Sequence, residues 1–115
     1  KKISVHRCPW NEVEKEIKNM NFIEFLGTLE NDHPDSELSP EIRALWWTKK
    51  GNWEIAHQIA QTVGTKRGDW IHAHLHRVEG DLSNASYWYS RAGKPICQTS
   101  LPAEWEALVK DQLTQ

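Results

Sequence analysis

Two stretches of this chain carry the same pattern of glycine, polar and alanine residues, and this internal repeat limits the possible folds more than any other feature. The second stretch, which begins at Ala73, follows the first, which begins at Ala44, at an offset of 29 residues. The matched pairs are Ala44 with Ala73, Gly51 with Gly80, Asn52 with Asp81, Ala56 with Ala85, and Gly64 with Gly93. A unit of two helices needs these residue types, because glycines end helices, polar residues cap them and small residues allow close crossings. The offset therefore predicts stacked helical hairpins.

Capping residues divide the segment 39–93 into four predicted helices. The first is expected to start with Ser39 as N-cap and Pro40 in the first helical position. Proline fits there because a backbone N–H at this position has no partner within the helix. The other three are expected to follow polar caps, which are Asn52, Asp69 and Asp81. Apolar residues recur three or four positions apart in each segment, as in amphipathic helices. We expect the four helices to end at glycines, which are Gly51, Gly64, Gly80 and Gly93.

The N-terminal segment, residues 1–38, is predicted to hold two helices and an acidic loop. An apolar stripe over residues 10–20 predicts the first helix. Asn21 with Glu24 three residues later forms a capping-box pattern, which predicts the second. Residues 30–37 are polar, acidic and contain proline, so we expect a loop there.

Residues 94–115 are predicted to form one C-terminal helix, which starts near Pro102. No alternating strand pattern of useful length is present. The sequence therefore predicts one all-α domain over residues 1–115, with two tandem helical hairpins at 39–93 between N- and C-terminal helices. A chain of 115 residues is long enough to bury roughly two-thirds of its unfolded surface.

Charge and hydropathy exclude two classes of partner. The formal net charge is −2 and the isoelectric point is near 6.3, whereas nucleic-acid-binding domains usually carry a basic stripe. No apolar run approaches the roughly 20 residues that span a bilayer. We therefore expect no nucleic-acid partner and no membrane insertion.

The chain ends and the cysteines indicate a cytoplasmic location. Lys1 and Lys2 are not followed by the apolar stretch of a signal peptide, and a start at lysine in place of methionine suggests a partial chain. Cys8 and Cys97 are the two cysteines. Without an export signal, we expect free thiols in a reducing compartment. The alternative is a disulfide between Cys8 and Cys97, which would tie the two terminal segments together.

The second stretch carries a signature of known helical repeats. Asp81, Ala85, Trp88, Tyr89 and Ala92 follow the pattern D-x-x-x-A-x-x-W-Y-x-x-A. In this the chain resembles the tetratricopeptide superfamily, especially its Sel-like relatives, and the resemblance implies a helical-repeat fold.

About half of the chain also resembles a family of small, mostly bacterial proteins. The shared elements are Leu-Trp-Trp at 45–47, Ala-His at 56–57 and His-Arg-x-Glu-Gly-Asp at 76–81. No activity is established for that family, so this resemblance implies a fold and no mechanism.

Histidines form the sharpest chemical pattern in the sequence. His72 and His76 lie four residues apart, hence on one face of a helix, and Glu79 follows three residues later. Zinc and iron sites use two histidines at this spacing with a carboxylate. Packing of the hairpins is expected to bring His57 close to this pair. The candidate metal ligands are therefore His57, His72, His76 and Glu79, with zinc or iron as the cofactor.

The alternative interpretation is that the same histidines have a structural role. They can form hydrogen bonds across helix interfaces or lie on a solvated face. The zinc-protease motif is absent, because Ala73 stands where its catalytic glutamate would be. No serine lies in a nucleophile-elbow sequence and no glycine loop for phosphate is present. We therefore predict no catalytic residue, and no cofactor other than this metal.

Seven tryptophans suggest a second kind of site. Adjacent Trp46 and Trp47 point about 100° apart on a helix, so both can be buried only if two sides are covered. We favour burial, but an exposed tryptophan in a groove is a typical binding hot spot. The first functional hypothesis is a non-enzymatic module that binds a protein or peptide, or a second copy of itself. Its groove would lie along the first and third predicted helices of 39–93 and comprise Trp46, Trp47, His57, Trp70, His72 and His76. The alternative is a metal-binding, hydrolytic protein that uses the histidine cluster.

Overall fold

Six helices and no strand make up residues 20–114, the part of the chain that this computed structural model describes. The all-α prediction is confirmed for these residues. The helices are α2 (Phe22–Thr28), α3 (Pro40–Lys50), α4 (Trp53–Thr62), α5 (Lys66–Val78), α6 (Leu82–Ala92) and α7 (Leu101–Leu113). Of the helix predicted over residues 10–20, only Met20 is described, and Cys8 lies outside the described residues.

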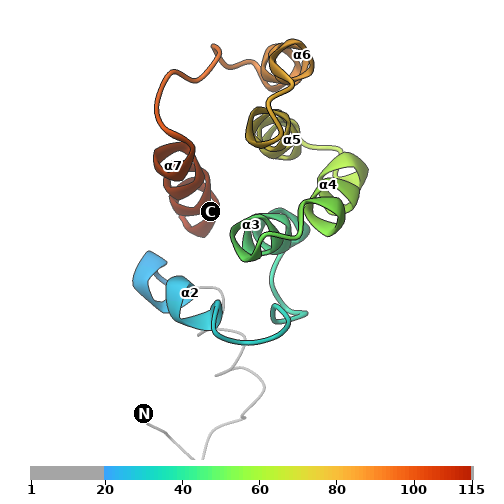
Figure 1. The fold of residues 1–115 in the computed structure, drawn as a ribbon. Coiled ribbons are helices and arrows are strands. Elements are labelled where there is room, and N and C mark those ends of the chain that lie inside the picture. The colour runs from blue at the N-terminus through green and yellow to red at the C-terminus, as the bar shows by residue number, and fades with distance from the viewer. Residues whose placement is uncertain (1–19, 115) are drawn as a thin grey trace, which may run out of the picture.

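The middle four helices follow one another in a curved row (Figure 1). In this row α3 packs on α4, α4 on α5 and α5 on α6. The chain then returns, so that α7 lies against both α3 and α5, while α2 packs on α7. The C-terminal helix therefore joins the two halves of the row.

Most helix ends are where the capping residues predict them. Asn21 and Glu24 form the complete capping box that opens α2, and Ser39 caps α3 in front of Pro40. Three of the four glycines adopt the left-handed conformation that favours glycine: Gly51 with φ 89°, Gly80 with φ 86° and Gly93 with φ 73°. The fourth, Gly64, directly follows Val63, the C-cap of α4. The prediction that these four glycines end helices is confirmed.

The predicted start of α5 is wrong by about one turn. The helix begins at Lys66 behind an N-cap at Thr65, so Asp69 lies in its first turn and does not cap it. Gly68, which directly precedes the predicted cap Asp69, is a buried residue within the helix. A Cβ atom at this position would lie 2.9 Å from both the Cγ1 and the carbonyl oxygen of Val63. Gly68 is therefore required for the close approach of two helices and not for a turn.

The turns α3–α4 and α5–α6 have the same hydrogen bonds. The Asn52 backbone N–H donates to the Trp47 carbonyl at 3.0 Å, and the Asp81 N–H donates to the His76 carbonyl at 2.9 Å. Both caps also have nearly equal ψ angles, 79° and 81°. Each hairpin thus places its second helix against its first through the same local geometry.

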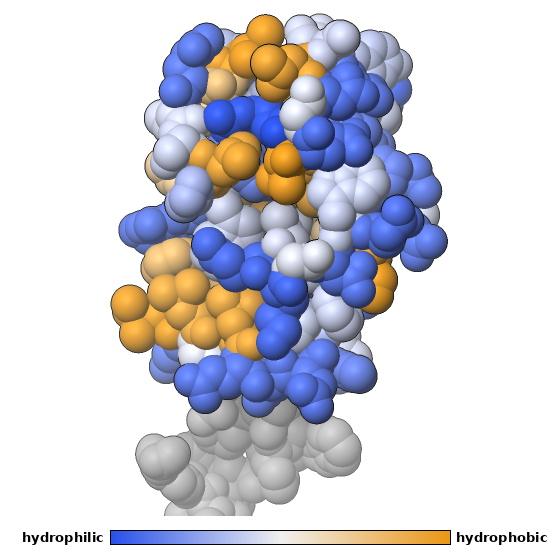
Figure 2. Space-filling model, viewed as in Figure 1, coloured by the Kyte–Doolittle hydropathy of each residue, from blue (hydrophilic) through white to orange (hydrophobic). Residues whose placement is uncertain are grey.

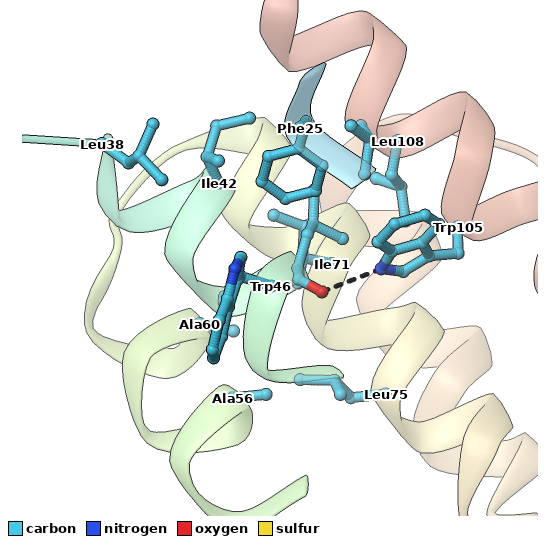
Figure 3. Packing of buried hydrophobic residues seen from close by; sticks show 13 residues of the cluster. Phe25, Leu38, Ile42, Trp46, Ala56, Ala60, Ile71, Leu75, Trp105 and Leu108 are labelled. Atoms are coloured by element: carbon cyan, nitrogen blue, oxygen red, sulfur yellow. Dashed lines mark hydrogen bonds between the residues drawn. The ribbon is translucent and has the colours of Figure 1, made fainter. Parts of the chain in front are cut away.

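Tryptophan supplies much of the main core, to which α2, α3, α4, α5 and α7 all contribute (Figure 3). Trp46 is fully buried and its indole N–H donates to the Thr28 hydroxyl. Trp105 is also buried and donates to the Leu45 carbonyl at 2.8 Å, which is the bond drawn in Figure 3. Trp47 remains half-buried. Of the two adjacent rings, only Trp46 is therefore completely enclosed.

The outer surface is mainly hydrophilic on the face shown in Figure 2. A broader hydrophobic area lies at the lower left, in the region of α2. Within the described residues, no helix has both the length and the apolar composition that crossing a bilayer requires.

Replacing Ala56 or Ala85 by leucine is expected to lower the free energy of unfolding by about 1–3 kcal/mol, because both sites are packed too closely for a larger side chain. Ala56 has no exposed surface and Ala85 is 1% exposed. Urea unfolding of each variant measures the effect. The matched control is Ala107→Leu at an exposed position of α7, where we expect a change within about 0.5 kcal/mol. Equal stability of all three variants would contradict the close crossing.

Candidate metal centre

Three histidines from two neighbouring helices converge in the described structure. His57 comes from α4, while His72 and His76 come from α5, one turn apart on the same face. One nitrogen from each ring can be chosen so that all three lie within 4.8 Å of one another. His72 and His76 are 4% and 6% exposed, and His57 is half-buried. The structure thus brings together the three histidines that the sequence analysis grouped.

Each ring is held by a neighbour outside the cluster. The Trp53 ring stacks on His57 with 4.6 Å between ring centroids, and the Trp88 ring stacks on His72 at 3.8 Å. The Nδ1 of His76 is 2.6 Å from a carboxylate oxygen of Glu79. A histidine that donates from Nδ1 to a carboxylate keeps its Nε2 lone pair free for a metal. The three rings are therefore oriented before any ion arrives.

Burial lowers the pKa of two of these imidazoles and so favours their neutral form at physiological pH. The pKa of His72 is lowered to about 4, first by burial and then by the neighbouring His57, His76 and Arg91. Burial also lowers the pKa of His57, helped by His76. The Nε2 atoms of His57 and His72 are 2.9 Å apart, so the two neutral rings share one proton. Neutral imidazole is the form that binds metals.

The cluster has nearly the dimensions of a tetrahedral site. A zinc ion with Zn–N distances of about 2.0–2.1 Å holds its ligand nitrogens roughly 3.4 Å apart. The shortest pair here must open slightly from 2.9 Å, and the others lie within 4.8 Å. When proteins bind partners, the backbone at the binding surface usually moves by no more than about 1 Å, while side chains commonly change rotamer. The arrangement can therefore close around one ion without moving the helices.

Glu79 lies in a different place from the three rings. Its carboxylate contacts the Nδ1 of His76. It is not among the ligand atoms of His57, His72 and His76 that lie within 4.8 Å of one another. It forms a second, more exposed group with His76 and Asp81. Glu79 therefore has the position of an outer residue that orients a ligand, not of a fourth ligand.

The tryptophans of the predicted groove do not all lie beside these histidines. Trp46 is buried in the core. The indole N–H of Trp70 donates to Glu104 at 3.0 Å, on the side of α5 that faces α7. Trp47 lines a separate open pocket of about 490 Å³ at the α3–α4 turn, together with Trp53.

A buried carboxylate network on the other side of α5 was missed by the sequence analysis. Glu104 of α7 is 1% exposed. Its two oxygens are bound by side chains of α5 and α6, which are Trp70, His74, Arg77 and Tyr89. The carboxylate therefore links α7 to both α5 and α6 through hydrogen bonds and ion pairs. His74 belongs to this network and not to the metal cluster.

One sequence signal could have revealed this network. The apolar face of α7 contains Leu101, Trp105 and Leu108, and Glu104 occupies a position on the same stripe. A carboxylate on a buried stripe requires partners. Their identity could not be read from the sequence, because they lie 15 to 34 residues away along the chain.

Acidic pH is expected to destabilise the fold through Glu104. Burial alone would raise the pKa of this carboxyl, but hydrogen bonds from His74, Tyr89 and Trp70 lower it to about 2 from an ordinary value of 4.5. Because the pKa is lower in the folded chain, the ionised form stabilises the fold above the unfolded pKa. This stabilisation is lost as the pH falls from about 4.5 to about 2.

Urea unfolding at a series of pH values measures this dependence. We expect the free energy of unfolding to fall across that window, and to fall less steeply in the variant Glu104→Gln, which has no carboxyl to protonate. Equal slopes in the two proteins would assign the acid sensitivity to other carboxyls.

Comparisons with protein-family models, with curated proteins and with solved structures found no match to this chain. The resemblance to tetratricopeptide repeats is therefore supported only at the level of an all-helical domain. Function has to be inferred from the site itself.

Proposed function

We propose that this protein binds one zinc ion through His57, His72 and His76. The observation that carries this proposal is the convergence of three imidazole nitrogens, one from each ring, within 4.8 Å. Three nitrogen ligands are the set that zinc uses in sites with one open position. Two of the three rings are buried, so the ion would sit largely inside the protein.

The surroundings of the rings support the same proposal. Metal-binding histidines nearly always donate their second ring nitrogen to an acceptor, often a carboxylate. Glu79 meets this requirement for His76. Stacking by Trp53 and Trp88 restricts the other two rings. A zinc ion held by three histidines carries water at its fourth position and lowers the pKa of that water to about 7, which is the basis of zinc hydrolysis.

We further propose that the hairpins α3–α4 and α5–α6 are two copies of a tetratricopeptide-like unit. The equal hydrogen bonds at the two turns and the matched Ala56 and Ala85 support this proposal. On this interpretation the zinc site lies between the copies, with His57 from the first and the other two ligands from the second.

Zinc titration of chelator-treated protein tests the function. With a chromophoric chelator as competitor, we expect one equivalent of zinc to bind. Bound zinc should also raise the melting temperature, because a ligand that binds only the folded state stabilises it. The control variant His33→Ala removes an exposed histidine outside the cluster and should behave like the wild type. Absence of stoichiometric binding would contradict the proposal and leave the histidines a structural role.

Protein or peptide binding is a second candidate function. The observation that favours it is the open pocket at the α3–α4 turn, where Trp47 and Trp53 are both accessible. Aromatic side chains in such pockets are frequent hot spots. A displayed peptide library selected against the wild-type protein tests this candidate, since peptides that use the pocket should no longer bind Trp47→Ala.

A further inference from the structure

A pocket of about 340 Å³ adjoins the histidine cluster on the side away from His76. It lies where the end of α4, the start of α5 and the end of α6 meet. Ala60, Val63 and the Trp88 ring contribute apolar surface, and His72 connects the pocket to the cluster. Ionisable side chains on its wall are Lys66, Asp69 and Arg91.

His72 presents an unused polar atom beside this pocket. Its Nε2 faces His57, but its Nδ1 forms no hydrogen bond with any described residue. Once Nε2 binds a metal, the single proton of the neutral ring must reside on Nδ1, which then becomes a donor. His76 already has Glu79 as its outer acceptor. For His72 no described residue supplies such an acceptor, so that water or a ligand bound in the pocket can take this position.

The charges on the pocket wall favour an anion as that acceptor. Lys66 is anchored at the rim, because its Nζ donates to the Arg91 carbonyl at 3.0 Å, and two further N–H groups remain. The Arg91 guanidinium lies over the Trp88 ring at 5.0 Å, and its Nε is 3.8 Å from Asp69. Two cations and one carboxylate leave a net charge of +1, which one anionic group would neutralise.

We propose that this pocket binds the anionic oxygen group, a carboxylate or a phosphate, of a small ligand through Lys66, Arg91 and the Nδ1–H of His72. The inference rests on the proposed zinc site, because the metal fixes the proton on Nδ1. The bound anion is the outer acceptor of a metal ligand, so anion and metal strengthen each other's binding. This coupling is reciprocal. The apolar wall of Ala60, Val63 and Trp88 accommodates the uncharged part of the ligand.

Cobalt(II) titration, followed by the visible absorption of the bound ion, tests the coupling. The titration is run with sodium sulfate, with sodium acetate, and with sodium chloride alone at the same ionic strength. We expect at least one oxyanion to tighten cobalt binding about tenfold, as outer acceptors of metal-bound histidines do. Sulfate represents a phosphate group and acetate a carboxylate, so the stronger effect identifies the ligand class.

Two variants assign the effect to this pocket. Arg91→Gln and Lys66→Gln should lose the oxyanion effect, so that each variant binds cobalt with equal affinity in all three salts. Lys110→Gln, an exposed change on α7, should retain the effect. Circular dichroism checks that each variant is folded.

The possible failures are distinct. Cobalt binding of equal strength in all three salts would overturn the anion pocket and leave the zinc site intact. Tightening that persists in both pocket variants would place the anion elsewhere and also overturn the pocket. No cobalt binding in any salt would overturn the metal site and the coupling with it.

Discussion

Replacement of Glu104 by alanine is expected to lower the free energy of unfolding by about 3–5 kcal/mol. The carboxylate is 1% exposed and accepts hydrogen bonds from the indole of Trp70 and the hydroxyl of Tyr89. It also pairs with Arg77 at 2.6 Å and with His74 at 2.7 Å. Its removal leaves four buried or half-buried donors without their acceptor and creates a cavity beneath α7. Urea or thermal unfolding measures the loss.

Glu106→Ala is the matched control for this change. Glu106 lies two positions further along the same helix, is about half-exposed and pairs with Lys110 on the surface. Exposed pairs of this kind contribute about 0–1 kcal/mol. A loss below 1 kcal/mol in Glu104→Ala, similar to that of the control, would show that the network does not fasten α7.

Removal of one histidine ligand is expected to weaken zinc binding by more than about 100-fold. His57→Ala is the most informative change, because this ring is half-buried and its loss disturbs the core less than that of His72 or His76. Glu79→Gln keeps all three ligands but weakens the acceptor for His76, so we expect a smaller loss of about 10- to 100-fold. Competition with a chromophoric chelator measures both affinities.

The order of these effects distinguishes a metal site from a set of hydrogen-bonded histidines. We expect His57→Ala to have the largest effect, Glu79→Gln an intermediate effect and His33→Ala none. Equal zinc affinity in His57→Ala and the wild type would show that the ion binds elsewhere.

Local sequence signals predicted the helix ends well where capping alone decides them. Ser39 with Pro40 and the pair Asn21 and Glu24 specify a helix start through side chains three residues apart. The start of α5 could not be predicted in the same way. Gly68 has the composition of a loop, and only the packing of its backbone on Val63 shows that it belongs in a helix.

The candidate site was likewise predictable only in those features that depend on local sequence. Helical periodicity places His72 and His76 on one face, and the expected packing of neighbouring hairpins brought His57 to them. The outer partners Trp53 and Trp88 could not be assigned, because stacking depends on how the helices rotate against one another. The role of Glu104 could not be predicted for a similar reason, because its carboxylate stabilises the fold through hydrogen-bond donors that are distant in the sequence.

The measurement that tests the zinc proposal most directly is X-ray absorption at the zinc edge of protein loaded with one equivalent of zinc. We expect a first coordination shell with three imidazole nitrogens at about 2.0–2.1 Å and one further oxygen. A shell that contains sulfur, or fewer than three imidazoles, would contradict a site made of His57, His72 and His76.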